Sequence, residues 1–217
     1  KSLSVSGGGI ITDVAGNATS GYIITGTNLN DTYDFQMETT APTIVTVTST
    51  ANDGSYGIGG TIPVVVSFVN GTGGAAENLL LNSGTLDITL ATGGVGTTVN
   101  VSSITTSSTA SVDYVVAEGE TSGDLSVSAI AIGGGGSITD PFGNELSAAP
   151  VIPPGANLDD AKAIVIDAIR PTIASITSSS ANDTYGIDGD INVTITFSKA
   201  VTLAGGTLDL VLDAGYT

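Results

Sequence analysis

The side chains of this chain that could do chemistry are almost all carboxylates. Its 217 residues include 21 Asp or Glu and four Lys or Arg, and they include no His, Cys or Trp. Without imidazole or thiolate groups the chain cannot assemble a Ser-His-Asp or Cys-His nucleophile. It also lacks the ligands that zinc and most transition metals require. Oxygen ligands remain, and they favour calcium or magnesium.

Nine oxygen-bearing side chains are candidate calcium ligands at the junctions between domains. Calcium takes roughly six to eight oxygens at about 2.3 to 2.6 Å, so carboxylates from two adjoining domains and carbonyls of the linker would suit it. Magnesium demands a tighter octahedral geometry than loops readily form. The group expected at the junction after residue 169 comprises Asn52, Asp53, Glu118, Glu120, Asp124 and Asp167, and the group expected near residue 41 comprises Glu38, Asp140 and Asn144.

Some of these residues have a second interpretation as plain turns. Asp, Pro, Gly and Asn favour turns for backbone reasons alone, and they make up most of residues 140–144 and all of residues 52–54. Recurrence in several copies does not distinguish the two, because a turn that the fold requires repeats as faithfully as a ligand. The convergence of acids expected at one end of a domain is what favours a metal.

The composition also limits the partners and the activity. A net charge of −17 and a pI near 4.1 would repel nucleic-acid phosphates and anionic lipid. No apolar stretch approaches the roughly 18 residues of a membrane span, so we expect no direct membrane insertion of this segment. A glycosidase with paired carboxylates normally needs aromatic platforms for sugars, and the chain has ten Tyr or Phe and no Trp. We therefore expect no enzymatic activity.

An internal repeat explains how the acids would be positioned. Pro42-Thr43-Ile44 recurs 129 residues later as Pro171-Thr172-Ile173, and Phe68 recurs as Phe197 at the same spacing. The end of another copy is also visible, since residues 11–17 resemble residues 138–144 at a spacing of 127. The sequence therefore predicts part of a tandem array, which is typical of scaffolds and stalks.

Each repeat is expected to be an all-β domain. Residues 191–197 and 86–90 alternate strictly between apolar and polar side chains, which places the apolar ones on one face of a strand. Seven short strands per repeat indicate an immunoglobulin-like β-sandwich. They are expected at 43–49, 61–68, 85–91, 97–104, 111–117, 124–132 and 162–167, with one helical turn at 158–163.

The chain is then a series of tandem immunoglobulin-like β-sandwich domains, one complete and two partial. Residues 41–169 are the complete repeat, residues 1–40 the C-terminal part of a preceding repeat, and residues 170–217 the N-terminal part of a following one. Loops after the first, third and fifth strands would lie where the last strand leaves, which is why the first ligand group should converge there. The part at 170–217 has too few strands to bury its apolar residues, so the continuing chain or a neighbouring molecule must cover them.

Five blocks of sequence carry a resemblance to a known family. They are residues 52–62, 84–86, 114–120, 138–144 and 164–167. In this order they resemble the immunoglobulin-like repeats of giant bacterial cell-surface adhesins and motility-associated surface proteins. The resemblance implies a secreted or cell-surface protein without enzymatic activity, often with calcium between its domains.

Two hypotheses for function follow. The first is a calcium-stiffened extender or stalk, whose partners are neighbouring repeats of the same chain. The second is a subunit of a self-assembling surface layer or filament, whose domains pack or exchange strands between molecules. Isolated rods would favour the first hypothesis, and strong lateral or strand-exchange contacts would favour the second.

Overall fold

The computed structural model describes residues 12, 14–18 and 37–213. The chain divides into two compact units, Lys1–Thr39 and Thr40–Thr217, and each is considered by itself. Most of the expected partial domain at 1–40 lies outside the described residues, and the domain boundaries stay predictions. In the part of the chain that the structure describes, no helix is long and apolar enough to cross a membrane.

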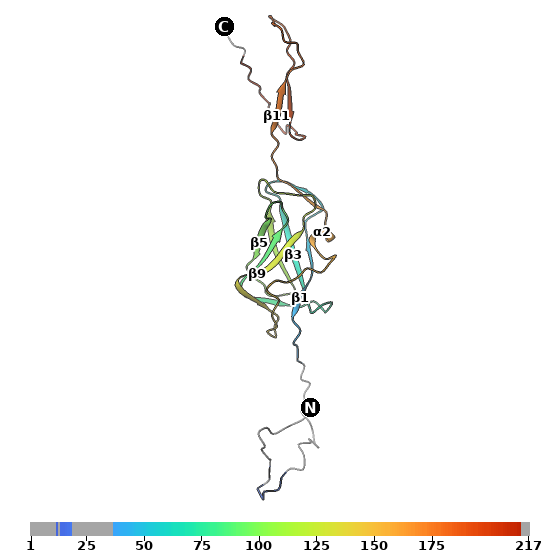
Figure 1. The fold of residues 1–217 in the computed structure, drawn as a ribbon, viewed down its shortest axis with the longest axis vertical. Helices are drawn as coiled ribbons and strands as arrows, with labels where there is room; N and C mark the ends of the chain where they lie inside the picture. The colour runs from blue at the N-terminus through green and yellow to red at the C-terminus, as the bar shows by residue number, and fades with distance from the viewer. Residues whose placement is uncertain (1–11, 13, 19–36, 214–217) are drawn as a thin grey trace. The chain divides into compact units, whose positions relative to one another are not determined.

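The unit Thr40–Thr217 consists of β-strands joined by turns, and its described residues contain one short helix (Figure 1). The expected all-β class is therefore confirmed. The elements are β1 (Pro42–Ser49), β2 (Gly54–Tyr56), β3 (Thr61–Asn70), β4 (Leu79–Leu90), β5 (Thr97–Val101), β6 (Thr105–Ser107), β7 (Thr109–Val115), β8 (Thr121–Ser122), β9 (Val127–Thr139), α2 (Leu158–Ala161), β10 (Ile164–Asp167), β11 (Ile173–Thr177) and β12 (Thr194–Phe197).

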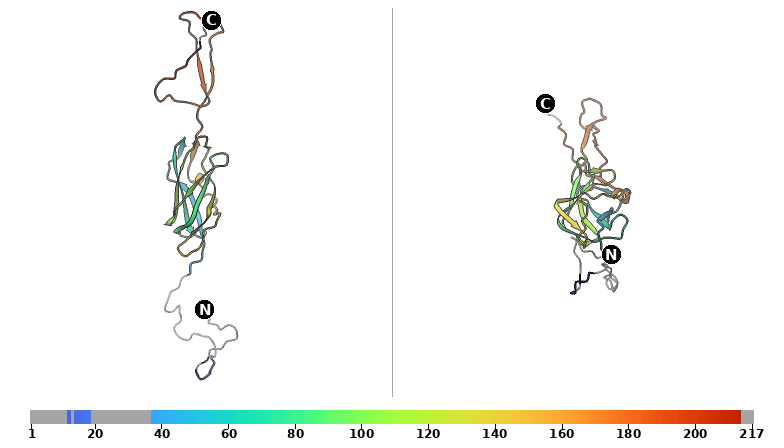
Figure 2. Two further views of the ribbon diagram at one scale, coloured as in Figure 1. Left: turned by 90° about the vertical axis from the view of Figure 1, so that its left-hand side faces the viewer. Right: turned by 60° about the horizontal axis from the view of Figure 1, so that its bottom comes forward.

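Residues 40–169, called the body from here on, contain strands β1 to β10. One antiparallel sheet has the order β1-β3-β7. In a second sheet β4 pairs antiparallel with β5, β6 and β9. Strand β10 lies between β2, to which it is parallel, and β8, to which it is antiparallel. Figure 2 shows these strands from two further directions.

A single apolar core joins the sheets of the body. The alternation of side chains buries one face of each strand, so that Val64 and Val66 of β3, Ile88 of β4 and Tyr114 of β7 have no exposed surface. Burial of each such side chain stabilises the fold by about 1.5 to 3 kcal/mol. Residues of β9 and β10, among them Ile130 and Ile164, complete the cluster.

Strands β4 and β9 run beyond the expected limits of 85–91 and 124–132, because glycines let their backbones pass closely. A Cβ atom on Gly84 would overlap the carbonyl oxygen of Gly133, and one on Gly136 would overlap that of Ser83. The pairing shifts register at Leu81/Ser83 and at Ser83/Thr85. Beyond this, β5 ends earlier than expected, and the short strands β2 and β6 were not expected.

Helix α2 occupies the expected helical turn and is fixed to β9 by its capping residue. The Asn157 Oδ1 atom accepts hydrogen bonds from the backbone N–H groups of Leu158 at 2.7 Å and Val127 at 3.1 Å. The Asn157 Nδ2 atom donates to the Val127 carbonyl at 3.0 Å. The Asp160 carboxylate accepts from the Asn157 N–H, which completes a capping box. Sequence position and tertiary contact thus agree at this turn.

The repeat found in the sequence is present in the backbone geometry. Strand β11 pairs with β12 in the register of β1 with β3, 129 residues on, and the same irregularity follows the first pair, Ile44 with Phe68 or Ile173 with Phe197. In the other unit, the isolated bridge between Thr12 and Ala18 matches the bridge between Thr139 and Glu145 at the spacing of 127. Equal spacing of these pairs indicates three copies of one structural unit.

Candidate functional site

The segment that leaves β10 is attached to the loop at residues 118–120. The Ala168 N–H donates to the Glu120 carbonyl at 3.0 Å, and the Gly119 N–H donates to the Ala168 carbonyl at 3.0 Å. Ala168 is buried, with 1% of its surface exposed. These bonds hold the start of the link between the body and residues 171–213, called the C-terminal hairpin from here on.

Two ion pairs flank this link. Arg170 Nε lies 2.6 Å from Glu118 Oε1, and Lys199 Nζ lies 2.7 Å from Asp167 Oδ1. The hydrogen bond from Arg170 and its positive charge hold the pKa of the Glu118 carboxyl below its usual range. The hydrogen bond from Lys199, with a further one from the Ile169 N–H, does the same for the pKa of Asp167. Two of the four basic side chains of the whole chain therefore lie at this junction.

A third basic residue, Lys162, acts one strand length away. Its Nζ atom donates to the Ala51 carbonyl at 3.0 Å. The bond ties the turn before β10 to the segment that leads into β2. In so acidic a chain, the basic side chains serve as cross-links between segments distant in sequence.

Glu120 is held inside the body rather than presented to a ligand. Its carboxylate accepts hydrogen bonds from the Tyr114 hydroxyl at 2.7 Å and the Ala117 N–H at 2.6 Å, and a short one from the Thr97 hydroxyl. Burial raises the pKa of the Glu120 carboxyl, but these hydrogen bonds outweigh burial and bring its pKa below the usual range. Burial and the bond to Glu120 raise the pKa of Tyr114 far above its usual value. This side chain connects β5, β7 and the loop after β7.

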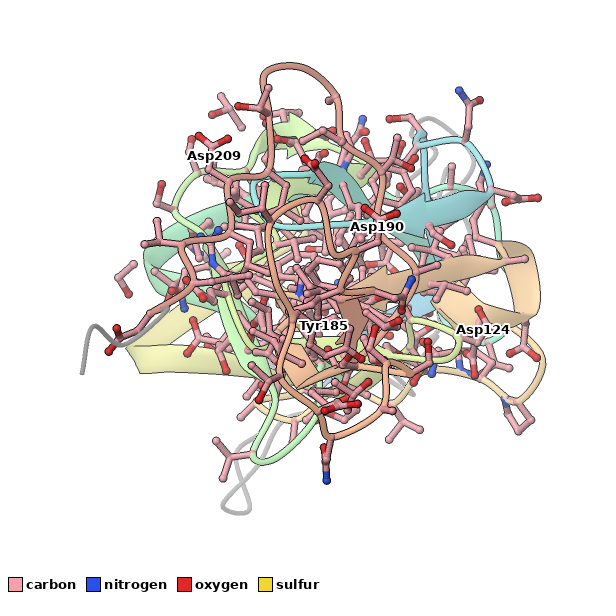
Figure 3. All side chains as sticks on the ribbon, turned by 90° about the horizontal axis from the view of Figure 1, so that it is seen from above. Asp124, Tyr185, Asp190 and Asp209 are labelled. Atoms are coloured by element: carbon pink, nitrogen blue, oxygen red, sulfur yellow. The ribbon has the colours of Figure 1, made fainter. Side chains whose placement is uncertain are left out.

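Asp53 and Asp124 satisfy backbone donors at the beginning of β10. The Ala163 N–H donates to Asp53 Oδ1 at 3.2 Å, and the Ile164 N–H donates to Asp124 Oδ1 at 3.3 Å. Asp124 is labelled in Figure 3. The backbone carbonyl of Asn52 accepts from the Tyr56 hydroxyl at 2.8 Å.

The first expected ligand group is therefore divided between the two ends of β10. Because β2 runs parallel to β10, with Gly54 opposite Ile164, Asp53 lies where β10 begins, whereas Asp167 lies where it ends. Three residues of strand separate these ends by about 10 Å. Across residues 12, 14–18 and 37–213, no group of three or more acidic side chains is arranged to hold a metal ion. The donor set of the described residues thus does not fit calcium at this junction.

In the second expected group, Asp140 and Asn144 form a closed turn. Asp140 is 2% exposed, and its Oδ1 atom accepts from the N–H groups of Phe142 and Asn144 at 2.8 Å each. Its Oδ2 atom accepts from Asn144 Nδ2 at 2.8 Å. Gly143, with φ of 92°, closes the turn. Glu38 belongs to the unit Lys1–Thr39, so its relation to Asp140 is not described.

An apolar hollow of about 570 Å³ lies beside the first half of β1. Its walls come from β1, the end of β3 and residues 146–153, with Pro42, Ile44, Leu146 and Pro150 among them. No ionisable side chain lines this hollow, so general acid or base catalysis has no group to act there.

The ion pairs at the junction were not expected from the sequence, although a signal was present. Lys199 stands where the first copy has Asn70, and Arg170 lies within the link. The scarcity of bases and the placing of two of them next to expected acids could have indicated pairing. The sequence analysis counted acids and assigned them to a metal, without asking which cation the chain itself supplies.

Comparison with known proteins adds no identity to these observations. No family model matches the chain, and no curated protein or solved structure matches it either. Function is therefore argued from the residues and their geometry.

Proposed function

We propose that this chain is a non-enzymatic structural segment of a secreted or cell-surface protein, built from tandem immunoglobulin-like β-sandwich repeats and acting as an extender or stalk. The observation that carries the proposal is the hairpin repeated at a spacing of 129 residues with the same register and irregularity. A unit repeated along a chain multiplies length and valency, and it does not by itself build an asymmetric pocket.

The strand order of the body supports the immunoglobulin-like assignment. A sheet of order β1-β3-β7 shares its core with a sheet in which β5, β4 and β9 are neighbours. The last strand, β10, runs parallel to the short strand β2 and antiparallel to β8. Antiparallel strands in two layers around one core are the arrangement expected of a seven-stranded sandwich.

The junction after β10 is the part that an extender must stiffen. Ala168 is bonded to the loop at 118–120, and the pairs Glu118–Arg170 and Asp167–Lys199 lie on the residues around it. Exposed ion pairs are weak and are screened by salt, so this stiffening depends on ionic strength. For calcium to occupy the same carboxylates, it would have to displace both basic side chains.

Small-angle scattering of the 217-residue chain tests this function. We expect an extended monomer whose largest dimension varies more as the ionic strength rises from about 0.02 M to about 0.5 M, because salt screens the ion pairs. Calcium added at constant ionic strength should leave the profile unchanged, and a calcium-dependent narrowing would restore the calcium-stiffened stalk. A compact monomer at every ionic strength would contradict the extender.

A self-assembling layer or filament is the second candidate, and the exposed apolar side chains of the C-terminal hairpin favour it. Sedimentation velocity over a range of protein concentrations separates the two candidates. A filament or layer subunit should form growing oligomers as concentration rises, whereas an extender should sediment as a monomer.

A further inference from the structure

The C-terminal hairpin exposes apolar side chains that the body buries at equivalent positions. Ile173 is 54% exposed and Ile191 is 51% exposed, whereas their counterparts Ile44 and Ile62 are 2% and 0% exposed. Within the described residues, β12 pairs only with β11, so its other edge has no partner. The large exposed set includes Ile173, Ile176, Ile191, Leu208, Leu210 and Leu212.

The body shows which element covers these positions. Its strand β3, the counterpart of β12, is paired on one edge with β1 and on the other with β7. In that second pairing Ile62 lies opposite Tyr114, Val64 opposite Val112 and Val66 opposite Ala110. The same apolar side chains, at the same spacing and on the same face, are thus buried when a strand of the β7 type is present.

The length of the strand changes in parallel. Strand β3 has 10 residues and is paired on both edges, whereas β12 has four. Residues 191–193 precede β12 and correspond to residues 62–64 of β3, but in the hairpin they are outside any strand. Pairing on a second edge supplies hydrogen bonds to a strand, so a partner should extend β12 towards residue 190.

We propose that the free edge of residues 190–197 is an acceptor site for an antiparallel strand with the sequence pattern of β7, provided by another unit of the same repeat. In the register of the body, Ile191 would face a Tyr, Val193 a Val and Ile195 an Ala. This is strand addition to an exposed sheet edge, in which the backbone supplies affinity and alternate side chains supply specificity. The inference rests on the repeat relationship in the proposed function, and it does not depend on stiffness at the junction.

A peptide tests the site directly. The probe is residues 108–117 of this chain, STASVDYVVA, added with a fluorescent label to the 217-residue protein. We expect saturable binding, together with slowed amide exchange at residues 190–197, including those before β12. A peptide of the same composition, scrambled so that its apolar residues no longer alternate, is the matched control and should bind at least about tenfold more weakly, because a register or face error exposes the apolar set.

Two variants on the same strand sharpen the test. Ile195→Asp places a charge among the side chains that the partner should cover, and it should weaken binding of the peptide by at least about tenfold. Thr196→Asp changes a neighbouring exposed residue on the other face and should leave the affinity within about twofold. Exchange at β3 should not change in either variant, since the peptide would otherwise be replacing β7 of the body.

Three results would overturn the proposal. They are equal binding of the scrambled peptide, equal binding by the Ile195→Asp variant, and protection of residues 190–197 that grows with protein concentration without any peptide. In the last case a second hairpin, rather than a strand of the β7 type, would be the occupant. The scattering test of the extender can fail while the peptide binds, and the reverse can also occur, so the two proposals fail separately.

Discussion

The hairpin of β1 and β3 in the body and the hairpin of β11 and β12 have the same register and irregularity, yet they differ in burial. Phe68 is 1% exposed in the body, whereas Phe197 at the equivalent position is only half-buried. The turn before the second strand also has the same hydrogen bond, from Gly60 to Gly57 or from Gly189 to Gly186. The comparison teaches that local sequence sets the shape of this hairpin, while strands from elsewhere set its burial.

The side chains of the two turns reinforce this point. The Tyr56 hydroxyl donates to the carbonyl four residues earlier at 2.8 Å, and the Tyr185 hydroxyl does the same at 2.9 Å; Tyr185 is labelled in Figure 3. Asp188 takes the positive φ that Gly59 has in the first copy, with values of 67° and 80°. A local geometry is therefore kept even where the residue is less suited to it.

The largest contrast between the copies is expected for the paired phenylalanines. Phe68→Ala should lower the free energy of unfolding of the body by about 3 to 5 kcal/mol, because it leaves a cavity in a closed core. Phe197→Ala should leave the stability of the body unchanged, because Phe197 is outside that core. Urea denaturation followed by tyrosine fluorescence and circular dichroism measures both. Equal losses in the two variants would mean that the copies share one cooperative core.

The next contrast is expected for two glycines with the same backbone. Gly84 and Gly206 have φ values of 75° and 74°, but a Cβ on Gly84 would overlap backbone atoms of β9, whereas one on Gly206 would meet nothing within 4 Å. Gly84→Ala should therefore destabilise the body by about 2 to 5 kcal/mol, as strain and overpacking combine. Gly206→Ala carries the φ strain alone and should leave the melting temperature of the body unchanged, which thermal denaturation can check.

A smaller contrast concerns pH, since Glu120 joins strands that the C-terminal hairpin lacks. The hydrogen bonds that lower its pKa stabilise the body above the usual pKa of a glutamate, and this stability is lost as the pH falls through the lowered value. Glu120→Gln should reduce stability at neutral pH and flatten the acid side of the stability profile. Denaturation at a series of pH values is the measurement, and Glu77→Gln is the control. An unchanged acid slope in Glu120→Gln would remove Glu120 from this role.

The smallest effects are expected at the junction that connects the two copies. Lys199→Met should return the pKa of Asp167 towards its usual value, and Arg170→Met should do the same for Glu118, because each variant removes the hydrogen bond that lowers the pKa. Carboxyl chemical shifts recorded through an acid titration report both values. Each variant is the control for the other, and a shift in both carboxyls from either variant would indicate a coupled cluster instead of two separate pairs.

Much of the fold could be predicted because its signals are local. Alternating residues placed β3 and β4, and Asn157 and Asp160 around Leu158 marked helix α2. The repeat itself needed only the comparison of Pro42 and Phe68 with their counterparts. Short strands such as β2 and β6 carry too few residues for an alternation to be seen, and their pairing depends on where β10 and β4 lie.

The candidate site was harder to predict, because a carboxylate in the sequence carries no sign of its partner. Asp167 and Glu118 were correctly expected near the end of β10, but Asp53 was placed at the wrong end of that strand. The parallel pairing of β2 with β10 decides its position, and parallel neighbours are not marked by any local residue. The calcium expectation stays a prediction for solution measurements.

By itself, the sequence determined the all-β class, the repeat and the local geometry of each hairpin, because alternation and turn residues act within a few positions of one another. The tertiary structure alone decided which apolar residues are buried and which acids meet a base. Burial depends on strands that come from distant parts of the chain, as β7 does for β3. Ion pairing depends on where folding brings Arg170 and Lys199, which lie 52 and 32 residues from Glu118 and Asp167.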